Sequence, residues 1–179
     1  MNLMGRYDTV VVGVGAMGSA TCYHLAQRGQ RVLGLERFDI PHTMGSSHGY
    51  TRIIPLAYYE HPAYVPLLQR AYELWAEIEQ QAGETLLYTT GSLDAGPAES
   101  QVFQGSLDSA LLHHLPHEVL TGKEVAQRFP AYRLPDTYRA LFQPQGGFLV
   151  PERSIVAYVE QAQALGATIR ARETVLDLT

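Results

Sequence analysis

Residues 7–36 read YDTVVVGVGAMGSATCYHLAQRGQRVLGLE, and this stretch predicts the fold of the chain. Residues 8–12 are a short β-branched run, which is typical of a buried strand. Residues 16–27 repeat apolar side chains at helical spacing, and Gly29 follows as a helix-ending residue. Residues 31–35 predict a second strand with Glu36 at its carboxyl end. The order strand, glycine turn, helix, strand indicates a Rossmann-like βαβ unit in an α/β protein.

The glycines between the first strand and the helix predict a dinucleotide site. Gly13, Gly15 and Gly18 have the spacing G-x-G-x-x-G. The first permits a tight turn, the second lets a pyrophosphate approach the backbone, and the third lets the helix pack closely on the strand. The helix N-terminus adds free N–H groups and a partial positive charge. Glu36 is placed to accept hydrogen bonds from an adenosine ribose, and an acid there disfavours the 2′-phosphate of NADP.

The glycine motif alone leaves two alternatives open. It does not separate FAD from NAD as the dinucleotide. A glycine turn can also serve only to tighten a strand–helix connection, although that interpretation gives Glu36 no role.

Composition limits the class of protein. The chain has 179 residues, 46% of them hydrophobic and 17% charged, which is typical of a soluble globular protein with a real core. The net charge of -5 and the lack of a basic run predict no nucleic-acid partner, and no apolar run reaches the ~18 residues of a membrane helix. The single cysteine, Cys22, excludes an internal disulfide and fits a reducing compartment, so we expect a cytoplasmic protein. Within its helix, Cys22 is expected to be a small core residue rather than a nucleophile.

The loop after the second strand is a candidate ligand contact. Residues 38–50 have no clear period, and they include Gly45, Ser46, Ser47 and His48. The loop leaves the carboxyl end of a strand, where open α/β sheets bind ligands. An ordinary surface loop explains the same composition equally well.

The rest of the chain predicts a segment inserted between the first elements of the sheet and later strands that join the same sheet. We expect a helix over 64–82, a strand pair over 86–95 interrupted at Gly91, a helical stretch over 97–114 and a short helix capped by Thr121 and Glu124. A strand over 138–143 follows, then the Gly146-Gly147 turn and a short apolar run over 148–150. A helix from Pro151 and strands over 167–171 and 174–179 then rejoin the first sheet. The predicted domains are 1–84, the first part of the dinucleotide-binding domain; 85–147, part of an inserted α+β substrate domain; and 148–179, the return. Because the last predicted strand has no terminal turn, we expect the cofactor domain to be incomplete and the chain to be the front part of a longer protein.

A cluster of histidines could suggest a metal site in the predicted insertion. His113, His114 and His117 lie close together, but no carboxylate or cysteine has ligand spacing to them. We therefore predict no metal.

Several motifs together resemble a known family. In order, they are Gly13-Val14-Gly15-Ala16-Met17-Gly18, Pro41-His42, Gly45-Ser46-Ser47-His48-Gly49, Thr51-Arg52-Ile53-Ile54, Ala57-Tyr58, Glu60, Tyr64-Val65-Pro66-Leu67, Glu73-Leu74-Trp75, Thr90-Gly91, Arg128-Phe129-Pro130 and Gly146-Gly147. This series resembles the monomeric sarcosine oxidase family, whose relatives include N-methyltryptophan oxidase and pipecolate oxidase. The resemblance spans nearly the whole chain and is far more specific than the glycine motif.

The resemblance implies FAD rather than NAD and a two-domain α/β flavoenzyme. It assigns Gly13, Gly15, Gly18 and Glu36 to the pyrophosphate and ribose, with Ala16, Met17 and Arg37 as cofactor-binding neighbours. Ser46, Ser47, Thr51 and Arg52 match positions that line the flavin, His48 matches a histidine beside the isoalloxazine, and Val175 matches a residue whose backbone meets the adenine.

The resemblance also implies a reaction. A hydride leaves the carbon next to an amine for flavin N5, which oxidises a secondary amine or N-substituted amino acid to an imine, and O2 then takes the electrons to give H2O2. Arg52 is a candidate catalytic residue that stabilises the anions formed, against the alternative of a structural salt bridge. His48 could tune the flavin or hold its loop. The expected partners are a small-molecule amine and O2, in a monomer. The alternatives are a flavin dehydrogenase with another acceptor and a non-catalytic flavin-binding fragment.

Three departures from the family pattern bear on the substrate and the chemistry. The family's second arginine, which grips a substrate carboxylate, is replaced by Pro55, which carries neither charge nor donor. Ser47 stands where the family usually has its first loop histidine, although some relatives also have serine there. The family's flavin-attaching cysteine and oxygen-activating lysine correspond to positions beyond Thr179, and Cys22 cannot replace them.

Overall fold

The computed structural model describes residues 6–177, and the chain forms two compact units. The first contains Met1–Arg52, Glu77–Leu86 and Leu149–Thr179, and the second contains Ile53–Ala76 and Leu87–Phe148. Residues 53–76 belong to the second unit, because apolar side chains such as Leu56, Ala57 and Val65 pack into its core. The domain boundaries after residues 84 and 147 stay a prediction. Among residues 6–177, no helix combines the length and the apolar character that a membrane crossing requires.

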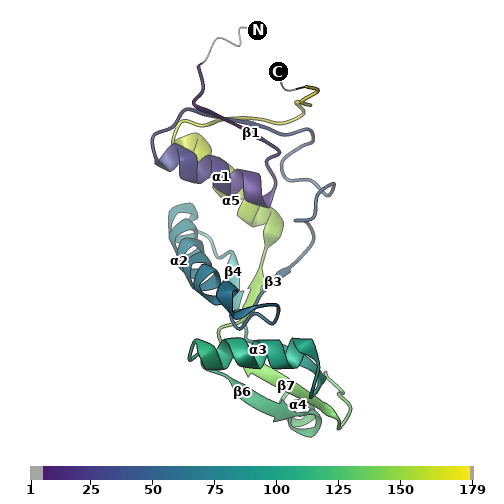
Figure 1. Ribbon diagram of the computed structural model, residues 1–179. Helices are drawn as coiled ribbons and strands as arrows, with labels where there is room; N and C mark the ends of the chain where they lie inside the picture. Colours follow the sequence, from purple (N-terminus) through teal and green to yellow (C-terminus); the bar gives the residue numbers. More distant parts are fainter. Residues whose placement is uncertain (1–5, 178–179) are drawn as a thin grey trace. The chain divides into compact units, whose positions relative to one another are not determined.

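The first unit is built on a parallel sheet with the strand order β1-β2-β9. Thr9 pairs with Val32, and Leu33 pairs with Thr168. Helices α1 and α5 lie side by side in this unit (Figure 1). Its elements are β1 (Thr9–Val12), α1 (Ala16–Gln27), β2 (Val32–Leu35), α5 (Pro151–Ala164) and β9 (Thr168–Arg170), and the end of α2 (Val65–Ala82) also belongs to it.

The core of the first unit lies between the sheet and these helices. Val14, Ile155 and Val159 are buried together, with Ile40 and Ile169 packed against them. Cys22 is fully buried, as predicted, and burial raises the pKa of its thiol to about 11. Val10 and Val12 are 51% and 56% exposed, so this face of β1 is not covered by the helices.

The late part of the first unit corrects one prediction. The strand over 167–171 is confirmed as β9, which joins β2 in the first sheet. The further strand predicted over 174–179 is wrong for residues 174–177, which have no regular structure, and residues 178 and 179 lie outside the described residues. The β-branched residues Thr174 and Val175 suggested a strand, but within residues 6–177 no neighbouring strand forms hydrogen bonds with them.

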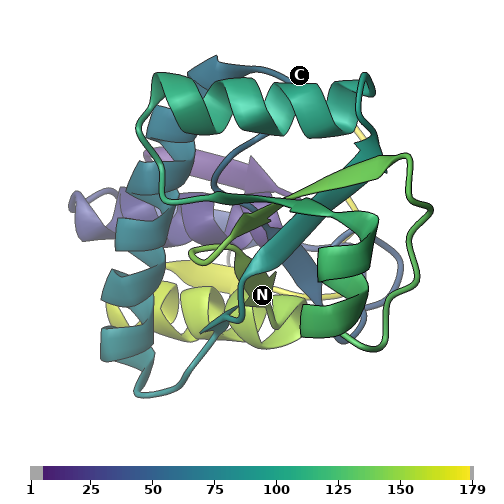
Figure 2. The same ribbon diagram turned by 90° about the horizontal axis from the view of Figure 1, so that it is seen from below.

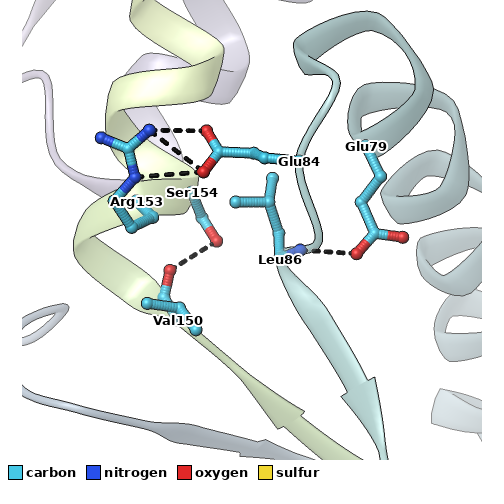
Figure 3. A network of polar contacts seen from close by, with 6 residues as sticks. All are labelled: Glu79, Glu84, Leu86, Val150, Arg153 and Ser154. Carbon is cyan, nitrogen blue, oxygen red and sulfur yellow. Dashed lines mark hydrogen bonds and ion pairs between the residues drawn. The ribbon is translucent and has the colours of Figure 1, made fainter.

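A polar network fixes two chain segments of the first unit where they approach each other (Figure 3). Arg153, in the first turn of α5, forms a two-pronged ion pair with Glu84, which follows α2. The backbone N–H of Val150 donates to the carbonyl of Leu86 at 3.0 Å. The N–H of Leu86 in turn donates to the carboxylate of Glu79 at 2.6 Å. The network therefore ties the start of α5 to the end of α2.

The second unit contains an antiparallel sheet with the order β5-β7-β6. Its helices α3 and α4 lie on opposite faces of that sheet (Figures 1 and 2). Leu141 faces the cluster that contains Phe103 of α3, and its neighbour Ala140 faces the cluster that contains Val125 of α4. The elements are η1 (Pro62–Tyr64), β5 (Ser92–Pro97), α3 (Gln101–Leu112), β6 (Glu118–Thr121), α4 (Gly122–Arg128) and β7 (Tyr138–Gln143). A separate small sheet has the order β3-β8-β4, formed by β3 (Arg52–Ile54), β8 (Gly147–Leu149) and β4 (Leu87–Thr89).

The second unit confirms some predictions and corrects others. The capping box is present, since Thr121 Oγ1 accepts from the N–H of Glu124 and the Glu124 carboxylate accepts from the N–H of Thr121. The two strands on either side of Gly91 exist but are not a pair, because β4 and β5 join different sheets. Strand β6 was not predicted, because its four residues lie directly against the helix cap.

Candidate cofactor site

The glycine turn places three backbone segments close together. Gly13 has a φ of +89°, which a side chain would strain, and its N–H donates to the carbonyl of Leu35 at 2.8 Å. A Cβ on Gly18 would lie 1.9 Å from the carbonyl oxygen of Gly13, so only glycine lets α1 approach the turn this closely. A Cβ on Gly15 would meet no atom within 4 Å and would point into open space. The turn therefore uses Gly18 for packing and leaves space above Gly15.

Helix α1 begins at this turn with its donors uncapped. Gly15 is the N-cap residue and has no side chain to bond the first amides. The first intrahelical bond is donated by Ser19 to the Gly15 carbonyl at 2.9 Å, so the amides of Ala16, Met17 and Gly18 precede it. These donors and the positive end of the helix suit an anionic oxygen.

Two adjoining cavities lie against the turn. The larger has a volume of about 510 Å³, and the smaller has a volume of about 240 Å³. Both are lined by Val12, Gly13 and Glu36. The larger is also lined by Gly15, Ala16, Met17, Gly18, Thr21, Phe38, Pro41, His42, Gly45, Ser46, Ser47 and Ile155, and the smaller by Leu35, Arg37, Glu173, Thr174 and Val175.

Glu36 is buried where the two cavities meet. Its Oε2 accepts from the N–H of Val14 at 2.8 Å, and its Oε1 accepts from the N–H of Phe38 at 3.0 Å. Burial raises the pKa of this carboxyl, but the two backbone donors and the His42 ring outweigh burial, so the pKa lies below its ordinary value. The group is therefore an ionised acceptor at neutral pH.

The loop after β2 is held by three contacts within the first unit. The guanidinium of Arg52 donates to the carbonyl of Ser46 through Nε at 3.2 Å and also through Nη2, and it donates to the Thr51 carbonyl through Nη1 at 2.9 Å. The N–H of Gly49 donates to Glu152 at 3.1 Å. Arg52 thus binds loop carbonyls. Its alternative role was a structural salt bridge, but no carboxylate among the described residues forms an ion pair with its guanidinium.

The structure brings most of the predicted site residues to these two cavities. Arg37 and Val175 line the smaller one, and the glycine-turn residues, Ser46 and Ser47 line the larger one. Within residues 6–177, neither lining includes His48, Thr51 or Arg52. His42 also lines the larger cavity, and the sequence predicts no role for it. Its contact with Glu36 depends on how the loop folds back, which the sequence pattern does not show.

The histidine cluster of the second unit is engaged with backbone carbonyls. His113 Nε2 lies 2.9 Å from the Pro62 carbonyl oxygen, and His117 Nδ1 lies 2.7 Å from that of Leu115. Across residues 6–177, no three metal-binding side chains are grouped so that they could hold an ion.

The comparison with known families decides what kind of cofactor site this is. Residues 8–179 match the model of the family described as FAD dependent oxidoreductase. The chain belongs to this family. Its cofactor is therefore FAD, and the dinucleotide alternative of NAD is removed.

Relatives of this chain include proteins that are named as oxidases. The monomeric sarcosine oxidase of Streptomyces avermitilis is 43% identical over 167 residues, and the N-methyl-L-tryptophan oxidase of Yersinia pestis is 37% identical over 163 residues. The matches cover 93% and 91% of this chain, which spans 44% of the length of each relative. NikD, an unusual amino acid oxidase essential for nikkomycin biosynthesis, has a similar solved structure: it is 33% identical with a TM-score of 0.81 over 93% of this chain and 43% of that one.

The residues present fit the FAD of this family. A diphosphate needs N–H donors and an approach without side chains, which the first turn of α1 and the space above Gly15 provide. A ribose needs an acceptor for its hydroxyls, which Glu36 provides between the two cavities. The donor set therefore agrees with the family.

Proposed function

We propose that this chain provides the cofactor-binding part of an FAD-dependent amine oxidase. The reaction is oxidation of the C–N bond of a secondary amine or N-substituted amino acid to an imine, with O2 as acceptor and H2O2 as product. The observation that carries the proposal is the 43% identity to a monomeric sarcosine oxidase across 93% of the chain, in which the glycine turn, Glu36 and the loop serines line one cavity.

The first unit supplies binding and orientation in this proposal. The amides of Ala16, Met17 and Gly18 hold the diphosphate, and Glu36 holds the adenosine ribose. Arg37 and Val175 line the space for the adenine. FAD, when bound, supplies the chemistry by accepting a hydride and passing electrons to oxygen.

Arg52 and the loop serines support the flavin side of the proposed site. By donating to the Ser46 carbonyl, Arg52 fixes the backbone of the loop that carries Ser46 and Ser47. Its guanidinium also adds positive charge beside the loop, which stabilises anionic states there. His48 belongs to the same loop and is proposed to orient it next to the flavin.

The test uses the protein expressed from the complete reading frame that carries this chain. We expect flavin absorbance, release of an adenine dinucleotide on denaturation, and amine-dependent oxygen uptake matched by H2O2. Flavin binding with amine oxidation only in the presence of an artificial electron acceptor would identify a dehydrogenase instead. Stoichiometric NAD without flavin would overturn the proposal.

A further inference from the structure

His42 connects the acid of the site to the loop that follows it. Its Nε2 lies 3.3 Å from Glu36 Oε1, and its Nδ1 accepts a hydrogen bond from the N–H of Met44 at 3.0 Å. Because Nδ1 accepts, the ring carries a proton on Nε2, and this N–H faces Glu36 Oε1; the position of the proton is assigned from the hydrogen-bond network. Both side chains are shielded, with 17% and 7% of their surfaces exposed, and the ring packs on Phe38 at 5.1 Å.

The donors to Glu36 come from three different parts of the first unit. Val14 belongs to the glycine turn, Phe38 follows β2, and His42 begins the loop that lines the larger cavity. A carboxylate has about four acceptor positions, so about one is left for a ligand hydroxyl while all three donors are bound. The three donors fix the orientation of the Glu36 carboxylate, and they therefore fix the direction in which its free acceptor position points.

We propose that His42 is a positioning residue for nucleotide binding, acting through Glu36. Its Nε2–H fixes Oε1 so that the carboxylate presents its free acceptor position to the ribose. Its Nδ1 simultaneously anchors the loop at Met44. This inference rests on the proposed function, since it takes the ribose of FAD as the ligand of Glu36.

The experiment measures ADP binding by calorimetry to the flavin-free protein expressed from the complete reading frame, because ADP carries the ribose and the diphosphate but no flavin. His42→Ala removes both ring contacts and is expected to weaken ADP binding about three- to tenfold, the range of the net contribution of one ordinary hydrogen bond. His42→Gln places an amide N–H near the position of Nε2 and should bind within about twofold of wild type. His42→Asn keeps only the acceptor for Met44 and should bind as weakly as His42→Ala. His24→Ala is the matched control, since His24 is a partly buried histidine of the same unit that packs on Tyr158.

A double-mutant cycle with Glu36→Gln tests the route of the effect. If His42 acts through the carboxylate, His42→Ala should lose most of its effect on ADP binding in the Glu36→Gln background. An equal loss in both backgrounds, or rescue by Asn instead of Gln, would overturn the proposal. If the wild-type protein binds ADP and the His42→Ala variant binds it equally well, the role assigned to His42 is wrong while the proposed function stands. If the wild-type protein binds neither ADP nor FAD, the proposed function is wrong, and the role of His42 falls with it.

Discussion

The carboxylate of Glu36 accepts a hydrogen bond of 2.8 Å from the backbone N–H of Val14, and this bond joins the end of β2 to the glycine turn. The two residues are 22 positions apart in the sequence, and both are buried. The acid that is placed for a ribose therefore also holds the turn that is placed for the diphosphate. Removing this carboxylate should therefore weaken both the stability of the first unit and the binding of the ligand.

Glu36→Gln is expected to destabilise the first unit by about 1–3 kcal/mol at pH 7, because an amide cannot accept from all the donors that a carboxylate satisfies. The effect should depend on pH. The folded-state pKa of Glu36 lies below its ordinary value of 4.5, so the unfolded state binds more protons as pH falls through that value. The stabilisation is thus fully present above about pH 5.5 and is lost as pH falls through the folded-state pKa. Urea unfolding at several pH values from 7 to 3.5 should show a shallower pH dependence for the variant; equal slopes would contradict the assignment.

Two alanine substitutions in the glycine turn should separate binding from folding. Gly18→Ala would place Cβ 1.9 Å from the Gly13 carbonyl oxygen, so we expect a loss of about 1–3 kcal/mol or more in stability. Gly15→Ala meets no protein atom within 4 Å, so stability should change by less than about 1 kcal/mol while ADP and FAD binding is lost. Thermal unfolding and calorimetric titration of both variants check this. A Gly15→Ala variant that binds normally would show that the diphosphate lies elsewhere.

The glycine turn could be predicted from sequence because its residues act through the local backbone. The spacing of Gly13, Gly15 and Gly18 and the cap formed by Thr121 and Glu124 depend on neighbours a few positions away. Other features depend instead on packing between residues far apart in the sequence. These are the contact of His42 with Glu36, the placement of β4 and β5 in different sheets, and the formation of strand β6. The strand predicted over 174–179 shows the same limit, since β-branched composition does not provide a neighbouring strand.

A buried glutamine in the second unit should be critical for its stability. Gln143 is 1% exposed; its Oε1 accepts from the N–H groups of Leu56 and Ala57, each at 2.7 Å, and its Nε2 donates to Asp94 at 2.7 Å. Gln143→Leu leaves these groups unsatisfied and should cost about 3 kcal/mol or more. The matched control is Gln145→Leu, because Gln145 Oε1 is buried without a partner among the described residues, and its removal should change stability by less than about 1 kcal/mol. Denaturant unfolding should rank the two variants in this order, and equal losses would contradict it.

Cys22 should report the opening of the first unit. The side chain is fully buried, and burial raises the pKa of the thiol to about 11, so both access and thiolate formation are suppressed at pH 8. We expect a thiol reagent to label Cys22 slowly in the folded chain and rapidly in urea. Destabilising the unit with Gly18→Ala should raise the labelling rate, whereas Gln143→Leu in the other unit should raise it much less. Rapid labelling of the folded wild-type chain would contradict the buried position.

Pro55 is expected to direct the enzyme away from small amino acid substrates. The backbone around it is anchored, since Tyr72 donates its hydroxyl to the Ile54 carbonyl at 2.8 Å and Gln143 binds the N–H of Leu56. A residue at position 55 is therefore held in a defined place, but proline offers neither the charge nor the donors of the arginine that the family resemblance leads us to expect. A buried arginine that grips a carboxylate contributes about 2–5 kcal/mol, so its absence should weaken use of sarcosine roughly 30-fold or more. A bulkier amine has more apolar surface with which to compensate, and the stacked rings of Tyr58 and Tyr59 lie a few residues further along the chain.

We therefore expect the protein from the complete reading frame to prefer a bulkier amine, or one without a carboxylate beside the nitrogen. Oxygen consumption with sarcosine, N-methyltryptophan, pipecolate and uncharged secondary amines gives kcat/KM for each. Pro55→Arg should raise kcat/KM for sarcosine by roughly 30-fold. Pro66→Arg, which adds the same charge at an exposed position of α2, should leave it unchanged. If sarcosine has the highest kcat/KM in the wild-type protein, another cation must bind the carboxylate and the role assigned to position 55 is wrong.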